Sequence, residues 1–457
     1  MSFHHNELEQ LTHHYNNPQN EIIVFYGSDA DGVGEILRNF LKGKSFFYYR
    51  ARNCVSRLQL QLFYDEIREE LPKGTGINVR YSDILTSMLS VVCKKRIIVI
   101  DEFQHMIKSD PEFMDDIVRT VHNKWSNQSV LFLLVTSNAS WVEHGMVEKL
   151  GENAYEINAT IALKPLSFAD LRTHFSKWSF QDCVMGYAVF GGELGRIRKL
   201  DPELSLQENI CAQVLTPGGS FHEQGQRILP EELREPAVYT TILEAMATGH
   251  KKLNELHKIT GFERAKIIVY LKNLSELGIT QKVESFLAPG HENVQKGVYG
   301  IRDPFIRFWF CFVYPHYSKL PFSEPERFYK KYVEGNLVTF SGKAYVDVCR
   351  EYLENLIADQ KLPYAYKEPG TWYGKVGTVD LIAEDDEGHI LVAYCNFEKN
   401  KMSAADLEWN LYCISQAKVK CDSLYLFSYH SFDEKLKKAV SYDPSIVLIE
   451  GDLDVQR

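Results

Sequence analysis

Short apolar runs alternate with amphipathic segments through the first 165 residues. The apolar runs are rich in β-branched and aromatic residues and predict buried strands; they lie at Glu21–Tyr26, Ser45–Tyr49, Arg96–Ile100 and Val130–Val135. The segments Glu35–Leu41 and Tyr81–Val92 have the spacing of helices. Strands that alternate with helices indicate a parallel sheet with helices on both faces, so residues 1–165 are predicted to form a three-layer α/β domain.

The pattern changes after residue 165. Residues 166–230 have helical spacing and are predicted to form a helical lid. Residues 231–300 then show three helical segments followed by polar strands and a glycine-rich return, at Pro236–Ala247, Leu253–Ile259, Glu263–Leu277 and Lys296–Gly300. Three helices followed by a hairpin are typical of a winged helix-turn-helix.

The last third of the chain contains a second α/β pattern. Residues 301–340 are rich in aromatic residues and are interrupted by prolines, which indicates a connector. Residues 341–457 are predicted to form the last domain, with a helix from Gly342 and strands at Thr378–Ala383, Ile390–Tyr394 and Ser423–Phe427.

A glycine-rich loop follows the first predicted strand and precedes a helix, which is the context of a phosphate-binding loop. Such a loop reads GxxxxGK[ST]: its backbone amides surround the phosphates, its Lys binds the outer phosphates and its hydroxyl binds Mg²⁺. Here Gly27 and Gly32 stand at the spacing of the two glycines. Val33 occupies the Lys place and Gly34 the hydroxyl place, so the loop lacks both side chains that hold the nucleotide.

Two carboxylates, Asp29 and Asp31, lie inside this loop. A like-charge contact with a phosphate at ~4 Å costs about 1 kcal/mol in water and about 4 kcal/mol near a protein surface. We therefore expect ATP and Mg²⁺ to bind weakly or not at all. A glycine turn that only joins a strand to a helix is the alternative interpretation of the loop.

The strand Arg96–Ile100 ends in Asp101 and Glu102, the pattern of a Walker B motif. In a working site the Asp holds Mg²⁺ and the Glu polarises the attacking water. Ligands of parallel sheets bind at the carboxyl ends of the strands, so the glycine loop and the acidic pair are predicted to meet. The predicted nucleotide contacts are Gly27, Gly32, Gly34, Ser137 and Asn138.

Three further segments make the comparison with a known family specific: Leu163–Phe168 (LKPLSF), Arg234–Pro236 (REP) and Asp303–Pro315 (DPFIRFWFCFVYP). With the two motifs above, they resemble the archaeal-type AAA+/STAND P-loop ATPases, over almost the whole chain. The resemblance implies ATP with Mg²⁺ as cofactor and a polar sensor at Ser137 or Asn138. The arginine pair that the family often has before KPLSF is missing from Glu152–Ala159.

The last domain of this family resembles PD-(D/E)XK nucleases. That chemistry needs a helix Glu, a strand Asp and a Glu-x-Lys on the next strand, which together hold a divalent metal and orient water. By this resemblance Asp380 is the surviving strand carboxylate, whereas Val346 stands at the helix Glu place. Tyr394 and Asn396 stand where Glu-x-Lys is expected, so nuclease activity is not expected and Asp380 is a vestigial metal ligand.

The predicted winged helix-turn-helix makes DNA a candidate partner. Residues 231–278 contain seven Lys or Arg and seven Asp or Glu, so this module has no net basic charge. DNA-binding modules normally show a basic surface, and an unidentified protein partner is the alternative.

Charge and cysteine content limit the classes of protein to which the chain can belong. The net charge of -10 disfavours a general nucleic-acid coat. Nine scattered cysteines without a CxxC pair indicate reduced thiols in the cytoplasm. The N-terminus lacks the pattern of a signal peptide, and the apolar stretch near Phe305–Tyr314 is too short to span a membrane.

Three interpretations remain open. The first is an AAA+/STAND regulator or scaffold with a degenerate catalytic centre. The second is a working ATPase with a divergent loop that uses Asp101 and Glu102. The third is a DNA-binding regulator that uses the winged helix.

Overall fold

The computed structural model describes residues 5–27, 32–71, 80–89, 95–123, 129–229, 234–286, 297–398 and 400–455. The chain divides into two compact units. Unit 1 consists of residues 1–166 with 193–195, and unit 2 consists of residues 167–192 with 196–457. Among the described residues, no helix is long and apolar enough to cross a membrane.

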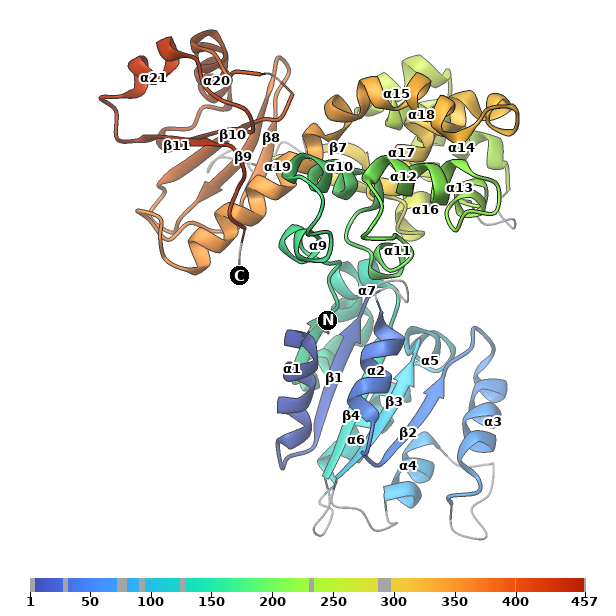
Figure 1. The fold of residues 1–457 in the computed structure, drawn as a ribbon. Helices are drawn as coiled ribbons and strands as arrows, with labels where there is room; N and C mark the ends of the chain where they lie inside the picture. Colours follow the sequence, from blue (N-terminus) through green and yellow to red (C-terminus); the bar gives the residue numbers. More distant parts are fainter. Residues whose placement is uncertain are drawn as a thin grey trace. The chain divides into compact units, whose positions relative to one another are not determined.

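Unit 1 contains a five-stranded parallel sheet in the order β2-β3-β4-β1-β5 (Figure 1). Its strands are β1 (Glu21–Tyr26), β2 (Phe46–Arg50), β3 (Lys95–Asp101), β4 (Ser129–Thr136) and β5 (Ala159–Ala162). The predicted α/β class with a parallel sheet is therefore confirmed. The sequence pattern did not indicate β5, because this edge strand buries only Ile161 and shows no apolar run.

Helices cover both faces of this sheet. They are α1 (His5–Asn16), α2 (Val33–Leu41), α3 (Ser56–Ile67), α4 (Tyr81–Leu89), α5 (Gln104–Ser109), α6 (Phe113–His122), α7 (Ala139–His144) and α8 (Met146–Leu150). A 3₁₀ helix, η2 (Gly151–Glu156), precedes β5. The predicted helix from Tyr81 ends at Leu89, and the rest of that prediction lies outside the described residues.

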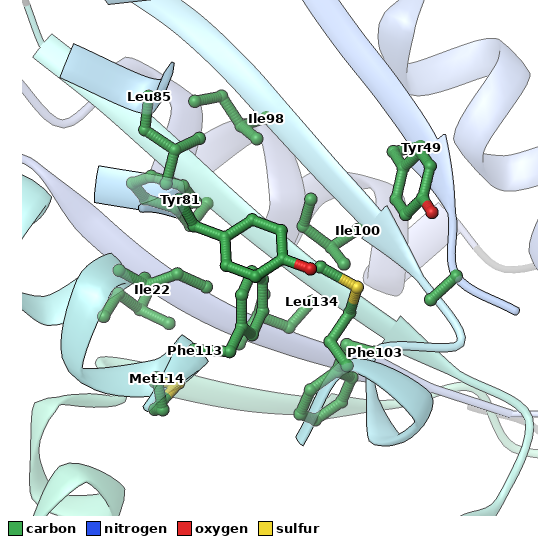
Figure 2. Packing of buried hydrophobic residues seen from close by; sticks show 14 of the residues in the cluster. Ile22, Tyr49, Tyr81, Leu85, Ile98, Ile100, Phe103, Phe113, Met114 and Leu134 are labelled. Carbon is green, nitrogen blue, oxygen red and sulfur yellow. The ribbon is translucent and has the colours of Figure 1, made fainter. Parts of the chain in front are cut away.

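Alternate residues of β1 pack into two different hydrophobic clusters. Ile22 and Val24 belong to one cluster, which contains Tyr81 and Phe113 from the helices (Figure 2). Ile23 and Phe25 belong to the other cluster, together with Leu11, Val33 and Phe40. Because successive strand residues point to opposite faces, the two clusters lie on the two sides of the sheet, and the domain has three layers.

Unit 2 begins with short helices: α9 (Phe168–His174), α10 (Phe180–Phe190), α11 (Leu194–Ile197, partly in unit 1), α12 (Leu206–Ile210), the π-helix η3 (Cys211–Leu215) and α13 (His222–Gln226). The three helices predicted next are present as α14 (Pro236–Ala247), α15 (Leu253–Thr260) and α16 (Arg264–Glu276). An antiparallel hairpin of β6 (Thr280–Glu284) and β7 (Gly297–Ile301) follows them. Part of the predicted return, at Lys296, lies outside the described residues.

The aromatic segment that follows is folded into helices. These are α17 (Pro304–Phe308), η4 (Trp309–Val313), η5 (Tyr314–Phe322) and α18 (Pro325–Tyr332). Phe305, Phe308 and Trp309 are buried, so the aromatic side chains that the sequence assigned to a connector form part of the interior.

The last sheet is mixed, in the order β12-β11-β10-β9-β8. Its elements are α19 (Glu334–Ala358), β8 (Gly370–Tyr373), β9 (Thr378–Glu384), β10 (Ile390–Asn396), α20 (Ala404–Ala417), β11 (Cys421–Ser428), α21 (Glu434–Val440) and β12 (Ile446–Glu450). The helix predicted from Gly342 starts earlier, at Glu334. A side chain at Gly342 would meet nothing within 4 Å, so this glycine is an open helix position and not a helix start.

Candidate functional site

The glycines of the loop have structural reasons to be glycine. A Cβ atom at Gly27 would lie 2.7 Å from the Cβ atom of Leu163 and 2.9 Å from its carbonyl oxygen. Gly32 precedes α2 with a φ of +99°, a conformation that L side chains rarely adopt. Both glycines are therefore needed for the turn itself, with or without a phosphate. Asp29 and Asp31 lie outside the described residues.

The first turn of α2 presents no cation to the loop. Val33, at the Lys place, is only 3% exposed and belongs to a hydrophobic cluster of unit 1. Gly34 has room for a side chain, since its Cβ atom would come no closer than 3.6 Å to Arg38. The acidic residue of this turn is Glu35, which adds negative charge near the place of a phosphate.

The Asp101 carboxylate is engaged by protein groups on both of its oxygens. Oδ1 accepts a hydrogen bond from the backbone N–H of Glu102 at 3.0 Å. Oδ2 accepts one from the Tyr48 hydroxyl at 2.5 Å, and Nε of Arg50 lies 3.5 Å from the same oxygen. Tyr48 and Arg50 come from β2, whose end pairs in register with the end of β3.

Glu102 is held just as firmly. Its Oε1 accepts a hydrogen bond from Ser137 Oγ at 2.7 Å, its Oε2 accepts one from Gln104 Nε2 at 2.5 Å, and Arg50 Nη2 lies 3.7 Å from Oε1. Burial alone would raise the pKa of Glu102, but the bonds from Gln104 and Ser137 and the charge of Arg50 hold it below its usual value. Glu102 is therefore an ionised, fixed carboxylate.

The two predicted sensor residues have different roles. Ser137 binds Glu102, so the structure brings Asp101, Glu102 and Ser137 together at the carboxyl edge, as predicted. Asn138 instead caps α7, where its Oδ1 accepts a hydrogen bond from the Trp141 N–H at 3.0 Å. The sequence analysis missed Tyr48 and Arg50, because nothing local in FFYYR shows that its strand lies beside β3.

A magnesium ion at this acidic pair would compete with groups of the protein. Mg²⁺ binds near-octahedrally through free carboxylate oxygens, phosphate oxygens and water. Here the Tyr48 hydroxyl and the Arg50 guanidinium both contact Oδ2 of Asp101. Arg50 already supplies positive charge to the acidic pair, so the site is partly neutralised from within the protein.

The nuclease-like place in the last sheet has one buried carboxylate. Asp380 accepts a hydrogen bond from the Cys395 N–H at 3.0 Å, and burial raises its pKa to about 6. At the two places of the Glu-x-Lys motif, the side chains bind other protein groups. The Tyr394 hydroxyl donates to the Asn410 carbonyl oxygen at 3.0 Å, and Asn396 Nδ2 donates to Ser428 Oγ at 3.1 Å. Within the described ranges, no group of three or more His, Cys, Asp or Glu side chains could hold a metal.

Helix α16 shows little free positive charge. Lys266 lies 3.2 Å from Glu235, and Lys272 lies 4.0 Å from Glu276. Arg264 donates to Asn254 at 2.8 Å. The same helix exposes the apolar side chains of Ile268 (46%) and Val269 (55%), so its surface is mixed and not basic.

Residues 309–407 match the family model DUF234, described as archaea bacterial proteins of unknown function. The chain is 24% identical over 382 residues to the Methanocaldococcus jannaschii protein named Uncharacterized protein MJECL04, and the match covers 83% of each chain.

Solved structures similar to the chain include the Walker-type ATPase PABY2304 of Pyrococcus abyssi. The match has 14% identity and a TM-score of 0.43, and it covers 67% of this chain and 95% of that one. The Aeropyrum pernix ORC2 protein, in ADPNP–ADP complexes, matches with 15% identity and a TM-score of 0.43, over 68% of this chain and 92% of that one.

Proposed function

We propose that this protein is a regulator or scaffold of the AAA+/STAND type, whose ATPase-like domain binds ATP weakly or not at all and does not hydrolyse it. The observation that carries this proposal is the state of the acidic pair. Asp101 and Glu102 are contacted by Tyr48, Ser137, Gln104 and Arg50, which would compete with a metal ion and an attacking water for the carboxylate oxygens.

The loop supports the same conclusion. Phosphoryl transfer depends on positive charge that stabilises the oxygens of the transferred group. Val33 contributes an apolar side chain that packs in the core, and Gly34 contributes no hydroxyl. The backbone amides at the start of α2 are the groups most able to bind a phosphate, and without side-chain charge we expect such binding to be weak.

Mg²⁺-dependent phosphate release from the pure protein tests this proposal. We expect no release above that of the matched Glu102→Gln variant, which keeps the size of the side chain and loses its charge. A turnover of about 1 s⁻¹ or more, within the usual enzyme range and lost in Glu102→Gln, would establish the alternative of a working ATPase. A calorimetric titration with ATP, with and without Mg²⁺, is expected to show weak binding or none, unchanged by the metal.

Helix α16 supports a protein as the partner of the three-helix module. Ile268 and Val269 are exposed, whereas Lys266 and Lys272 already face carboxylates. A DNA-reading helix would instead present free Arg or Lys. The eight described cysteines are free thiols, which supports the proposed location in the reducing cytoplasm.

For the last domain we propose a structural or partner-binding role without cleavage of nucleic acid. A single carboxylate, Asp380, does not hold a catalytic divalent ion firmly. Incubation of the protein with plasmid and Mg²⁺ or Mn²⁺ is expected to leave the plasmid intact. Cleavage that disappears in Asp380→Ala would show that the domain is an active nuclease.

A further inference from the structure

Helix α19 presents two cations and one carboxylate on the same face. Lys343, Asp347 and Arg350 are spaced by four and three residues, so they lie along one side of the helix. Phe340 extends this row by one turn. Arg307 of α17 lies against it: its guanidinium carbon is 4.0 Å from the centre of the Phe340 ring, and its Nη2 donates to the Phe340 carbonyl oxygen at 2.7 Å.

Lys251, which precedes α15, adds a fourth cation. Its carbonyl oxygen accepts a hydrogen bond from the Tyr299 N–H of β7 at 2.8 Å, which fixes its backbone. Burial lowers the pKa of Lys343, Asp347 raises it, and the charges of Arg307, Lys251 and Arg350 lower it further. The basic cluster consists of five residues, all in unit 2: Lys251, Arg307, Lys343, Asp347 and Arg350.

The basic cluster is not neutralised by its own residues. Its four cations surround one carboxylate, Asp347, and Arg350 already pairs with that carboxylate at 2.9 Å. Among the described residues, no carboxylate lies within ion-pair distance of the side chains of Lys251, Arg307 or Lys343. Glu255 adds a second carboxylate: its Oε2 accepts a hydrogen bond from the Lys251 N–H at 3.0 Å, and its charge raises the pKa of Lys251. With Glu255 included, the cluster has a formal charge of +2 (four cations minus two carboxylates) in a chain whose net charge is -10.

Burial affects three of the cations, and two of these three remain exposed. Burial lowers the pKa of Lys251, Arg307 and Lys343, which shows that protein atoms surround their charged groups. Lys251 and Lys343 nevertheless remain exposed to solvent. Within the described structure, the buried Nε atoms of Arg307 and Arg350 have no hydrogen-bond partner. Like charges held together in this way destabilise the protein unless an anion compensates them.

We propose that the basic cluster binds the phosphate backbone of a nucleic-acid strand. Lys343 and Arg350 are seven residues apart, which is about 10 Å along a helix at a rise of 1.5 Å per residue. A row of this length can contact successive phosphates of one strand, and Lys251 and Lys343 are the exposed cations best able to reach them.

This site is separate from α16, the helix to which the sequence pointed, and it does not depend on the nucleotide chemistry of unit 1. Binding would be electrostatic and without base reading, because Lys and Arg that contact phosphates carry no sequence information. The expected behaviour is binding to many sequences and a strong dependence on salt.

Fluorescence anisotropy with a labelled 20-nucleotide single strand, measured on the full chain at several salt concentrations, tests the proposal. The variant Lys251→Gln/Lys343→Gln removes two exposed cations that make no ion pair in the described structure. We expect its Kd to rise at least tenfold at 50 mM salt. The slope of log Kd against log salt should fall by about 1.4, since each lost phosphate contact contributes about 0.7 for a single strand.

The matched control is Lys258→Gln/Lys272→Gln, which removes the same charge from α15 and α16. It should change the Kd less than twofold, and thermal melting of both variants should match the parent. Absence of binding by the parent at 50 mM salt, or a control that loses more affinity than the cluster variant, would overturn the proposal. So would displacement of the strand by ~1 mM inorganic phosphate at constant ionic strength, because the cluster would then be a site for a free anion.

Discussion

Arg50 is the residue that most changes the interpretation of the acidic pair. From sequence alone, Asp101 and Glu102 are a metal ligand and a base. In the folded protein they share a guanidinium that lies 3.5 Å from one carboxylate and 3.7 Å from the other. One side chain thus replaces part of the charge that a metal would bring.

We expect Arg50→Gln to lower the free energy of unfolding by at most about 1 kcal/mol, because the Arg50 side chain is 56% exposed and exposed ion pairs contribute little. The two carboxylates then lack their cation, so 10 mM Mg²⁺ should raise the melting temperature of the variant more than that of the parent. An equal response of the two proteins to Mg²⁺ would contradict the role assigned to Arg50.

Asp380 makes stability depend on pH. Its pKa is about 6 in the folded protein, above its ordinary value of 3.8, so folding favours the protonated form. Below pH 3.8 Asp380 is protonated in both the folded and the unfolded protein, so its shifted pKa does not change the free energy of unfolding. Between pH 3.8 and 6 the unfolded chain releases this proton while the folded protein keeps it, so the penalty grows over this range and is complete above pH 6, at roughly 3 kcal/mol.

Asp380→Asn should therefore be more stable than the parent at pH 8, and the difference should vanish near pH 4. Urea unfolding of both proteins at pH 4, 5, 6, 7 and 8 measures this difference. The Asn side chain still offers an oxygen to the Cys395 N–H, so that contact is retained. A constant difference across this pH range would show that Asp380 keeps its ordinary pKa.

Two glycines of the loop should respond in opposite ways to the same substitution. Gly34→Ala is expected to raise stability by about 0.5 kcal/mol, because Gly34 is helical and has space for a methyl group. Gly27→Ala is expected to cost about 1–3 kcal/mol, because its Cβ atom would lie 2.7 Å from Leu163. Melting temperatures distinguish the two, and a tolerated Gly27→Ala would refute the close packing.

At the scale of single elements, the segment DPFIRFW contains the start of a helix and the residue that caps it. Asp303 precedes α17, and its Oδ1 accepts hydrogen bonds from the Phe305 N–H at 2.8 Å and the Ile306 N–H at 3.3 Å. The same carboxylate pairs with Arg196, which is buried and donates to it at 2.7 Å. The motif is thus structural: it joins two helices that are distant in sequence.

Asp303→Ala removes both the cap and the partner of a buried cation, so we expect a loss of about 3–5 kcal/mol. Asp303→Asn keeps an acceptor for the cap but loses the charge, and it should cost clearly less. Urea unfolding at pH 7 measures both variants. Equal and small losses would mean that Arg196 finds another partner.

Helices and strands were predictable from the sequence where their burial determines the pattern of apolar residues. Helix α14 begins and ends at the predicted residues, Pro236 and Ala247, because Pro at its first turn and the apolar spacing are local signals. Strand β5 and the start of α19 were not predictable from the sequence. An edge strand with one buried residue has no apolar run, and a glycine in the open surface of a helix has the sequence signal of a loop.

At the scale of the whole molecule, the chain forms two compact units. We expect differential scanning calorimetry to resolve two transitions, because each unit has a hydrophobic core of its own. Gly27→Ala should lower the temperature of one transition and Asp303→Asn that of the other. A single transition that both variants shift would show that the units unfold together.

The sequence by itself determined the layers of unit 1 and the place of its acidic pair. Strands buried on both faces must be apolar throughout, and parallel strands must be separated by helices, so both features are visible locally. Only the tertiary structure decided which groups contact the acidic pair. The order of the sheet places β2 beside β3, so Arg50, 51 residues before Asp101, lies next to it. In unit 2, the packing of α17 against α19 places Arg307 on Phe340, which lies 33 residues further along the chain, in the same way. Such groups interact through space, at distances that depend on packing and not on separation along the chain.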